Sequence, residues 1–229
     1  SAEIVGLDVW PPEVSDMLRS PKNCLKEVKG GDKEFFDDLC RRYNHLGGAQ
    51  EEWVEYHSRS DIQGYFHYAR KEEVAKEFVV APAAVLAVGR AKDDMLRKLI
   101  AMRPGNFLFR TLTEMFGDNP ELLDLGMLGG SILGKAYAPS DEGCWSSSDA
   151  NQAFTSVLLP EWMWYLQATP PILAKEVPAA YRQPTWKDDE QITPFYRRMA
   201  MGGVHSVFLL MMIILRVMRR VLSTEPTLS

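Results

Sequence analysis

The chain has 229 residues, of which 46% are hydrophobic and 25% are charged, and its formal net charge at pH 7 is −5. These values predict an ordinary globular protein of one or two domains that can bury a core. The acidic balance excludes a surface that is basic throughout. The three cysteines share no metal-ligand spacing, and their odd number favours a reducing compartment, so we expect an intracellular protein of the cytoplasm or the nucleus.

Residues 1–70 are predicted to form a helical N-terminal extension ahead of a second unit at residues 71–229. Between Glu34 and Tyr43, aromatic residues and leucine recur at helical spacing, and a glycine pair follows. Similar patterns predict helices at Glu51–His57 and Lys71–Phe78. Because the first 70 residues contain no catalytic motif, we expect an acidic layer of surface helices there.

A β-hairpin is predicted early in the second unit. The runs 78–80, 85–88 and 97–102 are short and contain β-branched residues, which is typical of strands. Charged residues at 91–94 suit the tip of a hairpin between the second and third runs.

Positive charge is concentrated in two segments of this acidic chain. Residues 90–110 hold six Lys or Arg and two Asp, and residues 191–222 hold five Arg and no acidic residue. Two such segments can attract an anionic ligand, although solvated basic faces are equally compatible with the pattern.

The C-terminal half is predicted to contain one strand and three helices. Residues 144–148 form a strand that ends at Asp149, and a helix follows it. Pro160 begins a second helix, and residues 203–222 form a long closing helix. Residues 169–194 hold five prolines and are expected to be rich in loops.

The most apolar stretch of the chain is too short to cross a membrane. Val207–Leu215 is an uninterrupted run of nine apolar residues that ends at Arg216, whereas a transmembrane helix needs about twenty. We therefore expect a buried helix and no membrane partner.

Three short motifs follow one another at intervals of about fifty residues. The first runs from Arg97-Lys98 to Arg103-Pro104-Gly105-Asn106, and the second reads Asp149-Ala150-Asn151-Gln152-Ala153-Phe154 and continues to Leu159-Pro160-Glu161-Trp162. The third runs from Arg197-Arg198-Met199 to Met201-Gly202-Gly203. In order and spacing they resemble the fingers and palm of reverse transcriptases from retroelements. The resemblance covers residues 71–222 and implies an α+β fold, with reverse-transcriptase-like fingers and a partial palm beneath the helical N-terminal layer.

The resemblance implies an RNA-directed DNA polymerase, which transfers a nucleotide from a dNTP to a primer 3′-hydroxyl on an RNA or DNA template. This chemistry uses Mg²⁺, which prefers oxygen ligands. By resemblance, Asp149 is the catalytic carboxylate, and its side chain and the carbonyl of Ala150 are the metal ligands. Without the resemblance, Asp149 is more typical of a residue that caps a helix N-terminus than of a metal ligand.

The resemblance also implies which residues bind the nucleotide. Lys92, Arg97 and Lys98 would face the triphosphate, whereas Arg103 and Asn106 would brace the fingers. The alternative for these cations is a solvated edge of the hairpin, where lysine discourages aggregation.

Two further nucleotide-binding positions are implied. The ring of Phe154 would lie beneath the sugar and exclude a 2′-hydroxyl, although a core phenylalanine fits the pattern too. Met201 and Gly202 would lie against the template base or the nucleotide, because glycine permits close approach of the backbone; a glycine-rich helix start is the alternative.

The printed sequence ends before any Tyr-x-Asp-Asp hairpin, so it holds one of the three catalytic carboxylates of the family. We therefore expect no polymerase activity from the chain as printed. A second reading is a non-catalytic nucleic-acid or protein interaction module that keeps the fold. A third reading, a helical protein with accidental similarity, predicts no antiparallel pairing between residues 85–89 and 97–102.

Overall fold

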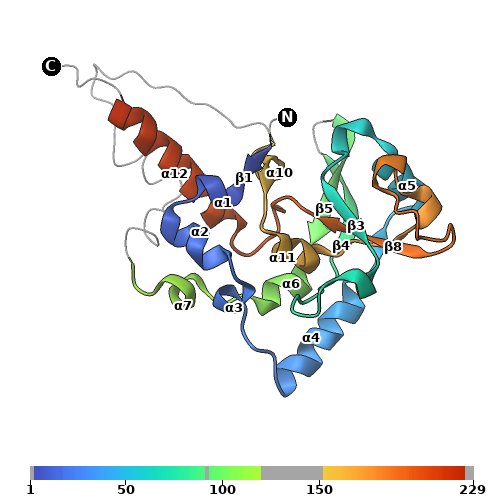
Figure 1. Ribbon diagram of the computed structural model, residues 1–229, viewed down its shortest axis with the longest axis horizontal. Coiled ribbons are helices and arrows are strands. Elements are labelled where there is room, and N and C mark those ends of the chain that lie inside the picture. Colours follow the sequence, from blue (N-terminus) through green and yellow to red (C-terminus); the bar gives the residue numbers. More distant parts are fainter. Residues whose placement is uncertain (1–2, 91–92, 120–151, 225–229) are drawn as a thin grey trace.

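The computed structural model describes residues 3–90, 93–119 and 152–224 of the chain. Figure 1 shows helices around small β-sheets, so the predicted α+β class is confirmed at this coarse level. The predicted strand at 144–148 lies outside the described residues, as do Lys92, Asp149 and Ala150.

The described strands form three small sheets, with the orders β1-β6, β2-β4-β5 and β3-β8-β7. Their bounds are Ile4–Val5 (β1), Leu46–Gly47 (β2), Phe66–Ala69 (β3), Ala84–Arg90 (β4), Asp93–Ala101 (β5), Val157–Leu158 (β6), Ile172–Leu173 (β7) and Gln191–Tyr196 (β8).

Most described helices are short, and the two longest are α4 and α12. The α-helices are Gly6–Val9 (α1), Pro12–Leu18 (α2), Pro21–Cys24 (α3), Gly31–Arg42 (α4), Gln50–Ser58 (α5), Arg103–Leu108 (α6), Leu112–Phe116 (α7), Ala153–Ser156 (α10), Glu161–Trp164 (α11) and Ser206–Thr224 (α12). The 3₁₀ turns are Ser60–Ile62 (η1), Lys71–Glu73 (η2), Tyr165–Gln167 (η3), Ala174–Glu176 (η4) and Ala179–Tyr181 (η5).

The predicted hairpin is present as β4 and β5. Its strands pair antiparallel, with Val85 opposite Ile100 and Ala87 opposite Lys98. This pairing removes the reading of the chain as a purely helical protein. The tip is tighter than predicted, because residues 93 and 94 belong to β5 and Arg90 pairs with Asp93.

The residues before position 70 are interleaved with the rest of the fold. Strand β1 pairs with β6, β2 pairs with β4, and β3 pairs with β8. The predicted helices at 34–43 and 51–57 are confirmed as α4 and α5. The N-terminal layer therefore contributes a strand to every sheet of the described chain as well as surface helices.

The helix predicted at Lys71–Phe78 and the strand predicted at 78–80 are wrong. Only the 3₁₀ turn η2 forms, because the Glu73 carboxylate accepts hydrogen bonds from the backbone of Arg70 (2.8 Å) and the indole of Trp186 (3.3 Å). Beyond it the chain bonds to η3 instead, with the Ala81 amide donating to the Tyr165 carbonyl at 2.9 Å. Tertiary contacts thus override the weak local preference.

The first of two main hydrophobic clusters lies beneath the N-terminal helices and α12. Trp10 is fully buried there, and its indole N–H donates to the Leu209 carbonyl at 2.9 Å. The predicted closing helix is confirmed as α12, with Phe208, Leu209 and Met212 in the cluster. Among the described residues, no helix combines the length and the apolar character that a membrane span requires.

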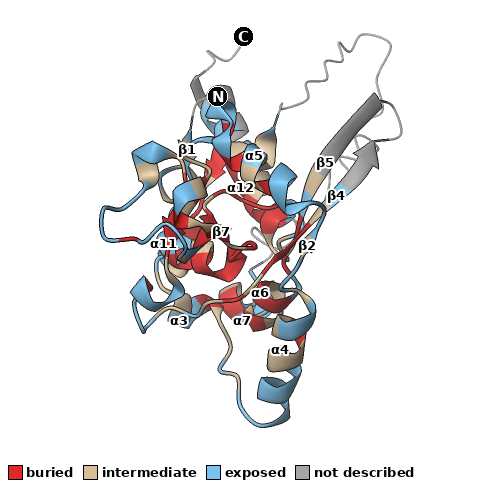
Figure 2. Ribbon diagram, turned by 90° about the vertical axis from the view of Figure 1, so that its right-hand side faces the viewer, coloured by how far each residue is buried: buried red, intermediate tan, exposed pale blue. Residues whose placement is uncertain are grey.

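The second cluster joins the hairpin to the sheet β3-β8-β7 and to α5. Its buried members include Trp53, Phe66, Val85, Ile100 and Tyr196. Figure 2 shows these buried segments in the interior, whereas α4 projects from the body with much of its surface exposed.

Candidate nucleotide-binding site

The first and third motifs are in direct contact. The Asn106 side-chain amide donates to the Gly202 carbonyl at 2.8 Å, and its carbonyl oxygen accepts from the Val204 amide at 2.9 Å. One amide thus joins α6 to the loop before α12, across nearly a hundred residues of sequence. The predicted bracing role of Asn106 therefore has a specific partner, the Met-Gly-Gly loop.

The glycines of these motifs allow the backbone to approach closely. A Cβ atom at Gly105 would lie 2.7 Å from the Leu166 carbonyl oxygen, which is too close for any side chain. A Cβ atom at Gly202 would lie 3.2 Å from the Ile100 carbonyl oxygen, a tight contact. Glycine at both positions thus lets α6 pack on η3 and the Met-Gly-Gly loop pack on the end of β5.

We predict that Asn106→Leu lowers the free energy of unfolding by about 1–3 kcal/mol, since it removes two hydrogen bonds that contribute about 0.5–1.5 kcal/mol each. Urea denaturation measures the change. The matched control is Asn23→Leu, because the side chain of the exposed Asn23 makes a long bond of 3.4 Å to the Met17 carbonyl. Equal effects of the two substitutions would contradict the bracing role.

The second motif continues into a strand that hydrogen-bonds to the segment 197–199. Strand β6 directly follows α10, and the Leu159 amide donates to the Arg197 carbonyl at 3.0 Å. In return, the Met199 amide donates to the Val157 carbonyl at 3.0 Å. Segments of all three motifs therefore meet through backbone and side-chain hydrogen bonds.

Gln152 has an unusual backbone conformation within the second motif. Its φ of 53° is left-handed, and among the described residues it is the one non-glycine with positive φ. Its carbonyl accepts hydrogen bonds from the Ser156 amide (3.0 Å) and the Thr155 hydroxyl (3.0 Å), which hold the turn. Such conformations cost free energy and cluster at functional sites. Gln152 is also the N-cap of α10, and its side chain makes no capping hydrogen bond.

Phe154 lies in α10, is half-buried, and packs against the first hydrophobic cluster. This position is compatible with a packing role, and its role beneath a sugar stays a prediction. Met201 has 63% of its surface exposed, and Gly202 beside it is also exposed. The Met-Gly pair is thus accessible to a ligand, and its contact with a nucleotide or a template base stays a prediction.

The predicted Mg²⁺ ligands, Asp149 and Ala150, lie outside the described residues. Their carboxylate and carbonyl oxygens have the chemistry that Mg²⁺ prefers. Within residues 3–90, 93–119 and 152–224, no group of three or more His, Cys, Asp or Glu side chains could hold a metal ion.

The Lys98 side chain contacts aromatic side chains of the protein. Its ammonium donates to the Tyr56 hydroxyl at 2.6 Å and lies 4.6–5.1 Å from the ring centroids of Tyr56, Phe66 and Tyr196. Burial, together with the nearby Arg59 guanidinium, lowers the pKa of Lys98 to about 7. For Arg97, the structure describes the backbone pairing with Val88. Triphosphate binding by Arg97 and Lys92 stays a prediction, whereas the Lys98 ammonium already has the Tyr56 hydroxyl as its partner.

Two arginines of the second basic segment also have internal partners. The Arg197 guanidinium donates to the Gly64 carbonyl at 3.0 Å and stacks 4.7 Å from the Trp164 ring. Arg198 is 6% exposed and forms an ion pair with Glu3 at 2.5 Å. These side chains hold the fold together and are not a solvated basic face.

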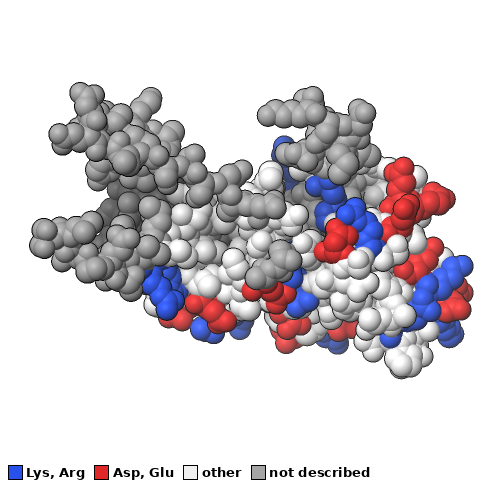
Figure 3. All heavy atoms as spheres, turned by 90° about the horizontal axis from the view of Figure 1, so that it is seen from above, with Lys and Arg blue, Asp and Glu red and all other residues white. Residues whose placement is uncertain are grey.

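The surface charge of the described residues is mixed. In Figure 3 basic and acidic side chains alternate over the described part of that face, with no single extended basic area. Arg103, at the start of α6, is exposed and is therefore available to an anion.

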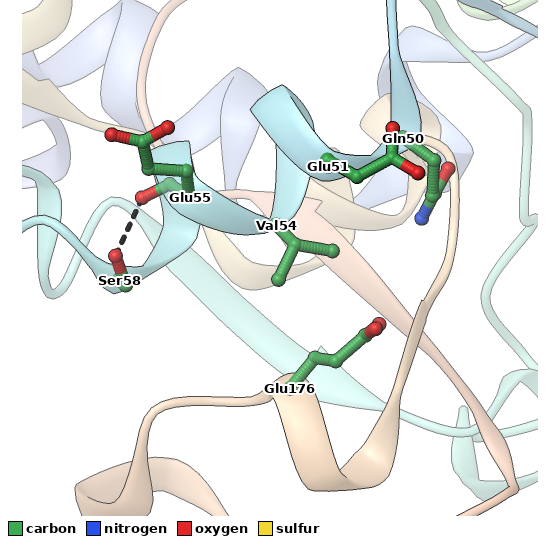
Figure 4. A pocket seen from close by; sticks show the side chains of 6 residues that line it. All are labelled: Gln50, Glu51, Val54, Glu55, Ser58 and Glu176. Atoms are coloured by element: carbon green, nitrogen blue, oxygen red, sulfur yellow. Dashed lines mark hydrogen bonds between the residues drawn. The ribbon is translucent and has the colours of Figure 1, made fainter.

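A pocket on the described part of the chain lies elsewhere. It has a volume of 340 Å³ and is lined by Gln50, Glu51, Val54, Glu55, Ser58 and Glu176. Figure 4 shows carboxylates from α5 and η4 around Val54. Three carboxylates without a basic residue would repel a triphosphate, and no predicted site residue lines this pocket.

The comparisons with known proteins do not identify the chain. No protein-family model matches it, and neither does any curated protein.

Proposed function

We propose that this chain forms the fingers and part of the palm of an RNA-directed DNA polymerase, and that it binds a primer–template and a dNTP at the junction of its three motifs. At this junction, Mg²⁺ would be held by Asp149 and Ala150 and would assist transfer of the nucleotide to the primer hydroxyl.

The observation that carries the proposal is the meeting of the three motifs. Asn106 reaches Gly202 and Val204, and the segment after Phe154 hydrogen-bonds to the segment before Met201. Accidental matches would be scattered over the fold, whereas a nucleotide site needs these motifs together. The antiparallel hairpin at residues 84–101 and the left-handed Gln152 also fit this site.

A second candidate is a non-catalytic module that binds nucleic acid or protein. The internal positions of Lys98, Arg197 and Arg198 favour it, because they reduce the positive charge available to a phosphate backbone. The two candidates differ in whether a dNTP matters to the interaction.

We predict salt-sensitive binding of a fluorescently labelled DNA primer on an RNA template, measured by anisotropy at several salt concentrations. Arg97→Ala and Arg103→Ala should each weaken binding similarly for different template sequences. If each removes one phosphate contact, each should reduce the slope of log affinity against log salt by about 0.7–0.9.

Arg41→Ala is the matched control, because Arg41 is exposed on α4 and is paired with Asp38. The affinity of Arg41→Ala for the primer–template, and its salt slope, should equal those of the unmodified protein. Unchanged salt slopes in both Arg97→Ala and Arg103→Ala would remove the hairpin and α6 from the interface.

A further inference from the structure

Lys98 is enclosed by aromatic side chains from three different elements. Tyr56 comes from α5, Phe66 from β3 and Tyr196 from β8, whereas Lys98 itself belongs to the hairpin strand β5. The contact therefore joins two sheets, β2-β4-β5 and β3-β8-β7, that share no strand. Ile100, on the same face of β5, is buried in the same cluster.

The Lys98–Tyr56 hydrogen bond can exist in both protonation states of the lysine. An ammonium donates to the phenol oxygen, and a neutral amine accepts from the phenol O–H across the same 2.6 Å. The ring faces attract the charged form. Burial opposes that form, and so does the Arg59 guanidinium, which lies 5.7 Å from the Tyr56 ring.

The neighbouring groups keep their charge between pH 7 and 9. Burial raises the pKa of Tyr56, Tyr68 and Tyr196 above the ordinary tyrosine range, so these phenols stay neutral. Burial lowers the pKa of His57 to about 3, so this imidazole is neutral as well. Arg59 stays cationic and is paired with Asp61, whose carboxyl pKa is held below its usual range by that arginine. Lys98 is the one group of this cluster that titrates in the interval.

We propose that Lys98 and Tyr56 form a pH-sensitive latch that positions the β4–β5 hairpin against the sheet β3-β8-β7, and that the latch tightens when Lys98 loses its proton. Lys98 is thus a positioning residue rather than a phosphate ligand. Its effect on bound nucleic acid rests on the proposed function, whereas the latch itself does not.

The direction of the pH dependence follows from linkage. Docking lowers the pKa of Lys98 to about 7, and the undocked lysine has its ordinary pKa of about 10.4. Between these values the undocked state binds more protons, so docking is weakest below pH 7 and strengthens as the pH rises. From pH 7 to 9 the docking equilibrium should shift by about tenfold or more.

The test uses the full chain without nucleic acid. An NMR titration of the Lys98 side chain should give a pKa well below 10, and the hydrogen-exchange protection of the β5 amides at 98–100 should rise about tenfold or more from pH 7 to 9. In Lys98→Met the protection should not change with pH, and in Tyr56→Phe it should be lower at pH 9. Lys33→Met, on exposed α4, should behave as the unmodified protein does.

An ordinary Lys98 pKa in the titration would overturn the proposal, and this result needs no variant to fold. The same pH response in Lys98→Met as in the unmodified protein would also overturn it. Primer–template binding gives a separate readout: the salt slope of Lys98→Met should equal that of the unmodified protein, whereas a loss of about 0.7–0.9 would make Lys98 a phosphate ligand. Absence of nucleic-acid binding would affect only the proposed function.

Discussion

Trp10→Ala is expected to lower the free energy of unfolding by about 3–5 kcal/mol, the usual cost of removing a fully buried tryptophan. The indole fills the space between α1 and α12, and its N–H pairs with the Leu209 carbonyl. Alanine would leave a cavity and would remove this hydrogen bond as well. The N-terminal layer is thereby predicted to be necessary for the stability of α12 and of the loop before it.

Urea denaturation compares the loss of unfolding free energy in Trp10→Ala with that in Phe35→Ala. Phe35 is 48% exposed and meets Phe107 edge to face, so its loss should cost far less, about 1 kcal/mol. A Trp10→Ala effect as small as that of Phe35→Ala would contradict the packing of the N-terminal layer against α12.

Acidification is expected to destabilise the protein through His57, by roughly 3 kcal/mol between pH 7 and pH 4. His57 is fully buried, with Nδ1 2.9 Å from the Tyr68 hydroxyl and Nε2 without a partner among the described residues. Burial lowers the pKa of the folded-state imidazole to about 3, against about 6.5 when unfolded. Between these values the unfolded state binds more protons, so stability falls as the pH falls from about 6.5 towards 3.

His57→Phe keeps a ring beside Trp53 and Phe66 and removes the titrating group. Its stability should therefore fall less between pH 7 and 4 than that of the unmodified protein, by roughly the same 3 kcal/mol. The control is His45→Phe, because His45 is exposed. Parallel pH curves for the unmodified protein and His57→Phe would show that the imidazole is not buried as described.

Local patterns in the sequence predict those elements whose structure is determined by local periodicity. The hairpin strands, α4, α5 and α12 follow from apolar spacing and from glycine or proline at their ends. The two-residue strands β1 and β2 have no such signal, because they exist through pairing with distant partners. The segment at 71–78 has helical spacing, but contacts of Glu73 and Ala81 determine its course.

Lys98 shows why part of the site could not be predicted. An isolated strand with Lys98 and Leu99 suggests that the leucine points inward, yet Leu99 is 38% exposed and Lys98 shares the buried face of Ile100. The cage rings come from positions 56, 66 and 196, which no spacing rule connects. Asn106 and Gly202, in contrast, belonged to motifs that the sequence already indicated, and the structure supplied their contact.

The most direct test of a polymerase-type site is whether Mg²⁺ and a dNTP strengthen primer–template binding. Anisotropy is measured with a labelled primer–template, with Mg²⁺ and either the dNTP complementary to the next template base or a mismatched one. The predicted result is tighter binding with the complementary dNTP than with the mismatched one, and loss of the difference in Asp149→Asn. Equal affinity with both dNTPs would contradict the polymerase site and favour the non-catalytic module.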